Sequence, residues 1–216
     1  MRRLVNIPET PYALYMRSRD LATEDLVEKW LDTLEAHPDA GLACGPHYRL
    51  GYYGDVIYRA TSIAHPQKLL SDNPGERMFA LMDGLYYSPY YGMYKTDVLK
   101  WLFNEAFMEH SPYLGLDFIL MLHFAAYHKL AYNSDAIYIV RDKYKPDGTN
   151  QYLEGYKNIY NLSENERKHP YNRLGMELQK FLEKHLILQP DEKAYYTNKL
   201  KKVFAQKSKD LNFTCW

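Results

Sequence analysis

The chain has 216 residues, in which 27 basic and 27 acidic side chains cancel. That length suits one domain with or without an appendage, and the balanced charge provides no global field for nucleic acid or an anionic membrane. With 46% hydrophobic and 25% charged residues, the composition excludes a mainly disordered chain. Tyrosine is unusually frequent, at 22 copies against 8 Phe and 3 Trp. Such rings suit partly wet surfaces that hold sugars, although ordinary core packing is the simpler explanation.

The sequence predicts a cytoplasmic protein with no transmembrane segment. Residues 1–8 carry charge but have no apolar region long enough for a signal peptide. The longest apolar run, Phe118 to Tyr127, is interrupted by His123 and is too short to span a bilayer. Two cysteines cannot form a disulfide framework, so we expect free thiols in a reducing compartment.

The first predicted elements are a strand and a helix. The aromatic run at residues 12–16 predicts a buried strand that ends at the polar stretch 17–20. Thr23 then predicts an N-cap, and the following helix stops at His37-Pro38. The predicted apolar face of this helix consists of Leu26, Val27, Trp30, Leu31 and Leu34.

A second strand and a long irregular excursion follow. The small apolar residues 40–45 predict a strand with little room around its backbone. From residue 47 to residue 73 the pattern is irregular, and we expect a short ribbon around residues 52–60. Asp72-Asn73-Pro74 predicts the start of the next helix, because proline is favoured at the first helical position.

The alternation of strands and helices then continues to Val140. We expect a strand through Tyr94, a helix capped by Thr96, an apolar helix from Leu116 to about His128, and a strand at 136–140. This alternation predicts an α/β fold with a small sheet flanked by helices. About four strands can be counted, and so few would leave a sheet edge or face uncovered.

Beyond residue 145 the sequence predicts a helical appendage. Ser163 to Glu166 form a capping box, Pro170 and Pro190 each predict a helix start, and leucines recur at helical spacing. We therefore divide the chain into an α/β core at 1–145 and helices at 146–216.

Three places could carry chemistry. Ser18-Arg19-Asp20 follows a strand, where open α/β sheets bind ligands, although a polar turn is the ordinary explanation. Asp117 begins an apolar helix and could act as a general base, or could only stabilise the helix terminus. The tyrosines from Tyr86 to Tyr94 could stack on a sugar ring, or could pack in the core.

Other function classes have little support in the sequence. It contains no HExxH pair, no glycine-rich phosphate loop with a Lys-Ser/Thr, and no GxSxG elbow. Lysines between Lys199 and Lys209 are most simply a solvated helix face, so we expect no nucleic-acid partner.

Three segments together resemble family 2 glycosyltransferases of bacterial surface-polysaccharide biosynthesis. They read TPYALYMRSRDLATEDLVEKWLDTLEAHPDAGLACG, NPGERMFALMDGLYYSPYYGMYKTDVLKWLF and GLDFILMLHFAAYHKLAYNSDAIYIVRDK. They cover about Thr10 to Lys143 and match the family in order and spacing. The resemblance implies the central and C-terminal part of a Rossmann-like GT-A fold. The implied activity is inverting transfer of a sugar from a nucleotide sugar to the hydroxyl of a glycan acceptor.

The resemblance also implies roles for particular residues. Asp20 falls on the last aspartate of the metal-binding DxD motif, which would hold Mn²⁺ or Mg²⁺, and Asp117 falls on the catalytic base. Arg141 falls on the closing arginine, which would approach the diphosphate of the donor. Arg19 departs from the family and could substitute for the metal charge against that diphosphate. The acceptor side would be lined by Tyr90, Tyr91, Tyr94 and Lys95.

Two departures from the family define the alternatives. Ser18 and Arg19 occupy acidic positions of the DxD motif, and the opening nucleotide-binding half of the family has no counterpart here. We therefore expect either a truncated transferase, completed by a protein partner or a second copy, or a non-catalytic descendant that binds a glycan or a protein. The transferase predicts Asp20 and Asp117 at one cleft, and the descendant predicts an exposed apolar edge. A chance resemblance predicts that residues 12–16 do not lie beside residues 136–140.

Overall fold

The structure is a computed structural model that describes residues 8–50, 57–61, 63–83, 88–109, 116–141, 180–185 and 189–210. Its strands are β1 (Tyr12–Tyr15), β2 (Leu21–Ala22), β3 (Ala40–Cys44), β4 (His47–Leu50), β5 (Ile57–Thr61), β6 (Gly92–Lys95), β7 (Lys129–Tyr132) and β8 (Tyr138–Arg141). Its α-helices are α2 (Leu26–Ala36), α3 (Pro74–Asp83), α4 (Thr96–Asn104), α5 (Leu116–Tyr127) and α9 (Pro190–Asp210). Its short 3₁₀ helices are η1 (Pro66–Leu70), η2 (Ser88–Tyr90) and η3 (Ala106–Glu109), and residues 180–185 are also helical.

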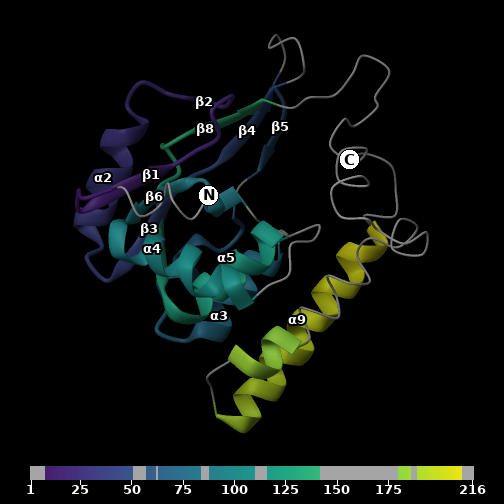
Figure 1. The fold of residues 1–216 in the computed structure, drawn as a ribbon. Helices are drawn as coiled ribbons and strands as arrows, with labels where there is room; N and C mark the ends of the chain where they lie inside the picture. The colour runs from purple at the N-terminus through teal and green to yellow at the C-terminus, as the bar shows by residue number, and fades with distance from the viewer. Residues whose placement is uncertain are drawn as a thin grey trace.

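The strands form two small mixed sheets flanked by helices, which confirms the α/β class but not the single sheet that we predict from the sequence (Figure 1). The first sheet has the order β1-β6-β3-β7, and the second has the order β2-β8-β4-β5. The pairs β3–β7 and β4–β8 are parallel, and the other pairs are antiparallel. Strand β1 is therefore an edge of the first sheet among the described residues.

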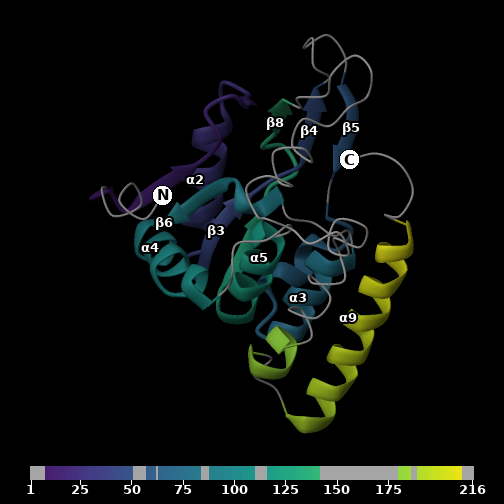
Figure 2. The same ribbon diagram turned by 45° about the vertical axis from the view of Figure 1, so that its right-hand side comes forward.

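Helices cover both faces of the first sheet (Figures 1 and 2). On one face, Leu26, Trp30 and Leu34 of α2 pack on small residues of the sheet. On the other face, α3, α4 and α5 form the larger core with Leu42 and Tyr94. Helix α5 is apolar on most sides because it is buried there, as its sequence predicts.

The positions at which the helices start were predicted better than the side chains that cap them. Asn73 accepts backbone hydrogen bonds from Gly75 and Glu76 at 2.8 and 3.3 Å, so α3 begins where the Asn-Pro signal places it. Thr23 is not the N-cap of α2, because Asp25 occupies that position and Thr23 offers only its backbone carbonyl to Leu26. The hydroxyl of Thr96 does not cap α4 but donates to the Thr10 carbonyl at 2.6 Å, which ties α4 to the start of β1.

One predicted core residue is wrong. Val27 shares the predicted apolar face of α2 but is 51% exposed, since α2 turns only the stripe containing Leu26, Trp30 and Leu34 toward the sheet.

The sheets contain strands that the sequence did not reveal. Strand β7 follows α5 after a single residue, and β4 precedes the ribbon predicted around 52–60, of which the structure describes β5, the partner of β4. Strand β1 pairs with β6, whereas β8 lies in the second sheet, which is the arrangement that a chance resemblance predicts. The short strand β2, only six residues after β1, does pair with β8.

Gly45 allows the two sheets to join closely. Strand β3 continues through Gly45 and Pro46 into β4, and the Pro46 carbonyl accepts from the Tyr138 amide at 3.1 Å. A Cβ atom at position 45 would lie 2.0 Å from the Ala136 carbonyl oxygen, so glycine is required by this close approach.

The C-terminal helices that the structure describes pack on the α/β core. Phe181 and Leu182 are buried with α5, and the Tyr127 hydroxyl lies 3.0 Å from Nδ1 of His185. Helix α9 starts at Pro190 as predicted, and its Lys199 lies 4.1 Å from the centre of the Phe79 ring. The helix predicted from residue 163 lies outside the described residues, whereas the helix predicted from residue 170 is described, and is helical, at residues 180–185. None of the described helices combines the length and the apolar character needed to cross a bilayer.

Candidate functional site

The topology brings the two predicted carboxylates to one edge of the first sheet. Strands β1, β3 and β7 run in the same direction, because β6 is antiparallel to both β1 and β3, and β3 is parallel to β7. Asp20 follows the carboxyl end of β1. Helix α5 leads directly into β7, so its first turn, with Asp117, lies toward the carboxyl end of β7. Ligands bind at this edge in open α/β sheets.

A tight turn after β1 holds Arg17 and Asp20 together. The Asp20 amide donates to the Arg17 carbonyl at 3.1 Å, which closes the turn. The Arg17 guanidinium then binds the carboxylate in a bidentate manner, from Nε at 2.6 Å and from Nη2 at 3.0 Å. The Asp20 side chain is fully buried, whereas that of Arg17 is 28% exposed. Such forked pairs fix the orientation of a guanidinium.

Asp20 also connects this turn to β8. The Tyr138 hydroxyl donates to Oδ2 at 2.6 Å, and the Arg141 amide donates to Oδ1 at 3.2 Å. The Tyr138 oxygen itself accepts from the Arg17 amide at 3.2 Å. The two carboxylate oxygens thus accept four hydrogen bonds, and the negative charge of Asp20 is used within the protein.

Tyrosine rings from three elements form a stack beside the turn. Tyr15 and Tyr91 are nearly parallel, at 3° with centroids 6.0 Å apart, and Tyr91 and Tyr138 are parallel within 9° at 5.8 Å. Trp30 of α2 continues the stack behind Tyr138 at 6.3 Å. Tyr15 and Tyr91 are only partly buried, so the outer part of the stack reaches the surface. Stacked aromatic faces of this kind can receive a sugar ring.

Charged groups of both signs act on the pKa of Tyr91. The Arg17 guanidinium carbon is 5.1 Å from the centre of the Tyr91 ring. Burial raises the pKa of Tyr91, Arg17 opposes this shift, and the carboxylates of Asp117 and Asp20 add to it. Burial likewise raises the pKa of Tyr15, and the Asp117 carboxylate acts in the same direction. The carboxylates of Asp117 and Asp20 therefore both act on the pKa of the same tyrosine.

Asp117 is held by the start of its own helix. Its Oδ1 accepts from the Phe118 amide at 2.9 Å, and the side chain is partly exposed. A carboxylate in this position can accept a proton from a bound hydroxyl group.

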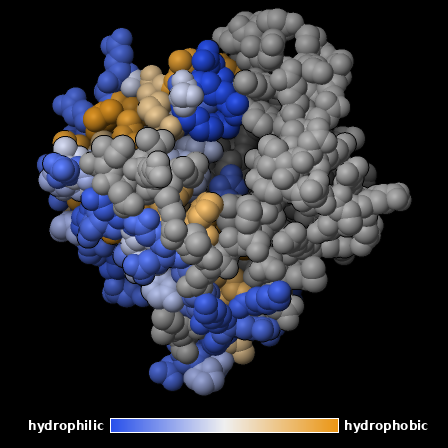
Figure 3. Space-filling view, in the orientation of Figure 1, coloured by the Kyte–Doolittle hydropathy of each residue, from blue (hydrophilic) through white to orange (hydrophobic). Residues whose placement is uncertain are grey.

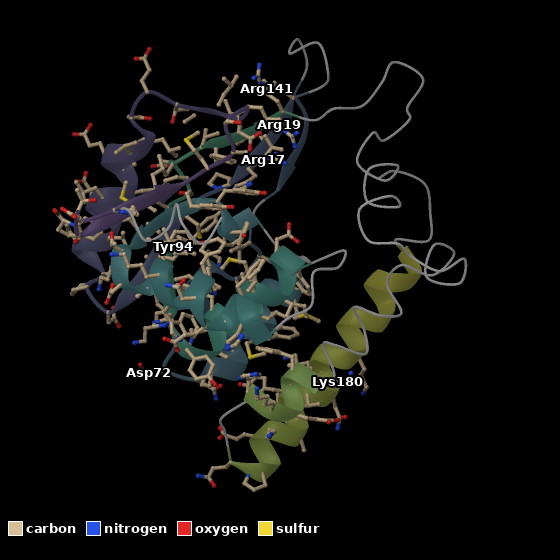
Figure 4. All side chains as sticks on the ribbon, in the orientation of Figure 1. Arg17, Arg19, Asp72, Tyr94, Arg141 and Lys180 are labelled. Carbon is tan, nitrogen blue, oxygen red and sulfur yellow. The ribbon has the colours of Figure 1, made fainter. Side chains whose placement is uncertain are left out.

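Arg19 and Arg141 lie at the same edge as Arg17 (Figure 4). The Arg141 guanidinium donates through Nε to the Arg19 carbonyl, and the Arg141 side chain is exposed. The space-filling view shows strongly hydrophilic side chains at this edge, next to apolar ones (Figure 3). The two arginines predicted to approach a diphosphate are thus brought together with a third.

The four predicted acceptor residues are not all at this edge. Tyr91 is in the stack, and Tyr90 packs edge-on against Tyr15 at 5.1 Å but is only 7% exposed. Tyr94 is fully buried on the face of the sheet that packs against α5, and its hydroxyl donates to the Tyr90 carbonyl at 2.8 Å. Lys95 pairs with Tyr12 at the opposite end of β1, and its ammonium donates to the Pro38 carbonyl. Tyr94 and Lys95 therefore do not line the surface that Tyr91 reaches.

The groups that surround the Asp20 carboxylate do not form a binding site for a divalent cation. Magnesium and calcium sites need several oxygen ligands, whereas the nearest partners of Asp20 are the Arg17 cation, a phenol and an amide that all donate to it. Within the ranges that the structure describes, no three His, Cys, Asp or Glu side chains form a group that could hold a metal. A cation at Asp20 would first have to displace Arg17.

Sequence reasoning missed Arg17, Tyr15 and Tyr138. The i,i+3 spacing of Arg17 and Asp20 in a polar turn was a usable signal, because these positions come together when the chain reverses. Tyr15 ends the predicted strand, so its place at the sheet edge could also be inferred. Tyr138 has no such signal, since its contact with Asp20 spans 118 residues.

Neither a protein-family model nor a curated protein sequence matches this chain.

Proposed function

We propose that this protein is a glycosyltransferase-like protein that binds a nucleotide sugar and transfers its sugar to a hydroxyl group of a glycan. The observation that carries the proposal is the position of Tyr91, which stacks on Tyr15 and is acted on by both the Arg17 cation and the Asp117 carboxylate. A sugar bound at this stack would be close to the Arg17 cation, and we place Asp117 as its base. The partial GT-A likeness in the sequence adds support, whereas the strand order adds none.

In this proposal the tyrosines bind and the carboxylate reacts. The partly exposed side chains of Tyr15 and Tyr91 would contact the sugar ring. Asp117 takes the proton of the acceptor hydroxyl, whose oxygen forms the new bond to the anomeric carbon. The bond from that carbon to the diphosphate oxygen breaks, and the diphosphate leaves with the electron pair. General-base catalysis of this type contributes about 10²–10⁴-fold to a rate.

A second candidate function is glycan binding without catalysis. The occupied carboxylate of Asp20 favours it, because the aspartate that the family uses for a metal ion is here bound by Arg17, Tyr138 and the Arg141 amide. A descendant of this type keeps the tyrosine stack and needs no base. The two candidates therefore differ in what Asp117 does.

The experiment measures release of nucleoside diphosphate from UDP-, GDP- and dTDP-linked sugars by the full chain, with simple glycosides as acceptors. Asp117→Asn keeps an oxygen for the Phe118 amide, so folding is retained while the base is lost. We expect this variant to reduce the rate at least about 100-fold. Asp97→Asn, the same change in the exposed first turn of α4, is the matched control and leaves the rate unchanged.

Equal rates in Asp117→Asn and wild type would contradict the assignment of the base. No release with any donor, together with glycan binding that Tyr91→Ala abolishes, would establish the non-catalytic candidate instead.

A further inference from the structure

The hydrogen bonds of Arg17 to the described residues use only part of its guanidinium group. Asp20 binds Nε and Nη2, and no residue in the described part of the chain is a hydrogen-bond partner of Nη1. The guanidinium lies over the Tyr91 ring and is partly exposed, so it is fixed in orientation and still accessible. Guanidinium groups held in this way bind phosphate oxygens well, because their orientation is set before the ligand arrives.

Three arginines lie at the turn after β1 and the end of β8. Asp20 binds the Arg17 guanidinium and accepts from the Arg141 amide, and the Arg141 guanidinium donates to the Arg19 carbonyl. Asp20 is fully buried and accepts four hydrogen bonds, so its charge faces the protein rather than the surface. Figure 4 shows the three arginines at one edge of the molecule, from the turn after β1 and from β8. An anionic group is the ligand that this arrangement fits.

We infer that Arg17, held by Asp20, receives the phosphate or diphosphate group of the ligand and that this site uses a guanidinium in place of a divalent cation. The inference rests on the proposed function for the identity of the ligand as a nucleotide sugar. In the transfer step, the electron pair of the broken bond stays on the diphosphate. Arg17 neutralises that added charge, while the proton of the acceptor passes to Asp117. Asp20 is then a positioning residue, and not a metal ligand.

An arginine with a purely structural role is expected to differ from Arg17 in its exposure and its hydrogen-bond partners. Arg77 shows what such an arginine looks like in this protein, since it is 5% exposed and each of its three guanidinium nitrogens binds a backbone carbonyl. Arg17 has the fixed orientation of a structural residue but retains exposure and a remaining donor. That combination points to a ligand.

The test is isothermal titration of the full chain with UDP and with inorganic pyrophosphate, in EDTA and in Mg²⁺ or Mn²⁺. We expect both probes to bind in EDTA with affinities within about twofold of those in metal, and binding to weaken as salt increases. Arg17→Gln is expected to weaken binding at least tenfold, and Arg17→Lys to a smaller extent because the charge is kept. Lys129→Gln is the matched control, since it removes a cation at the start of β7, at the opposite end of the sheet.

Asp20→Asn separates positioning from direct binding. It leaves Arg17 charged but loses the forked pair, so we expect weaker UDP binding that is not restored by added metal. Thermal unfolding of each variant shows whether it is folded at the assay temperature. Should Arg17→Gln not fold, the metal independence and the salt dependence of wild-type binding still decide the question.

Several outcomes would overturn the inference. They are a strict metal requirement for UDP binding, unchanged affinity in folded Arg17→Gln, or no binding of either probe. Transfer that proceeds only with Mn²⁺ would keep the proposed function and reject the role of Arg17. Metal-independent UDP binding without any transfer would do the reverse.

Discussion

Two arginines in this protein, Arg77 and Arg17, hold their surroundings together in different ways. Arg77, in α3, donates to the carbonyls of Ala125 and Ala126 at the end of α5, and to those of Ser71 and Asp72 before α3. All these partners are neutral carbonyls, and the side chain is buried. Burial lowers its pKa, and Asp72 opposes that shift.

Arg17, in contrast, is bound by one carboxylate on two of its nitrogens and lies partly at the surface. Burial lowers its pKa, but the hydrogen bond to Asp20 and nearby groups outweigh this effect, so the pKa is raised. Its pairing is therefore local, within one turn, whereas the contacts of Arg77 join two helices. The contacts of Arg77 therefore stabilise the fold, whereas those of Arg17 fix its orientation and leave the side chain partly exposed.

The largest effect is expected at Arg77. Arg77→Met keeps an apolar chain in the core but leaves four carbonyl groups without their donor. Buried groups that lose a hydrogen-bond partner cost about 1–3 kcal/mol each, so we expect a loss of roughly 3 kcal/mol or more in the free energy of unfolding. Urea denaturation monitored by circular dichroism measures it. Arg77→Lys can satisfy some of the carbonyls and should lose less; equal stability of Arg77→Met and wild type would contradict a structural role.

A smaller effect is expected at Tyr138. Tyr138→Phe removes the hydroxyl that donates to Asp20 at 2.6 Å but keeps the ring stacked on Tyr91 and Trp30. A hydrogen bond to a charged group contributes about 1.5–3 kcal/mol, and the remaining donors to Asp20 compensate in part, so we expect a loss of about 1 kcal/mol. The same denaturation experiment checks it.

Tyr12→Phe is the control for Tyr138→Phe, since it removes a hydroxyl at the opposite end of β1 and should leave stability unchanged. If both variants behave alike, the hydroxyl of Tyr138 does not hold the turn.

Local sequence signals predicted most of the helices and the α/β class. Asn73 and Pro74 defined the start of α3 because their side chains act within one turn of the chain. The strand at 40–45 was recognisable from its small apolar residues, which Gly41 illustrates, since a Cβ there would approach Val98 and Phe124 within 3.1 and 3.2 Å.

The site was predicted less well than the fold. It depends on which face of a strand each side chain lies on and on contacts between residues that are far apart in the sequence. In β6 only the side chains on one face meet α5, and this buries Tyr94 against Phe124 while Tyr91, just before the strand, stays at the edge. Asp20 was singled out as a carboxylate, but its partner Tyr138 is 118 residues away, so its hydrogen-bonded state was not visible. The position of Asp20 at the sheet edge could be predicted from the sequence, whereas the hydrogen bonds that its carboxylate accepts could not.

The smallest effect, on pH dependence, concerns the end of α5 near Arg77. His128 packs on Trp101 and Phe124, with centroids 4.7 and 5.2 Å away, and burial lowers its pKa, as do the charges of Arg77 and Lys95, against Asp97. The unfolded chain therefore binds a proton, below about pH 6.5, that the folded chain does not bind, so stability falls as the pH decreases. His128→Gln should reduce the stability difference between pH 7.5 and pH 5.5 by on the order of 0.5 kcal/mol, because solvent screens the partly exposed ring. Denaturation of both proteins at the two pH values measures this, and parallel pH profiles would show that acid acts elsewhere.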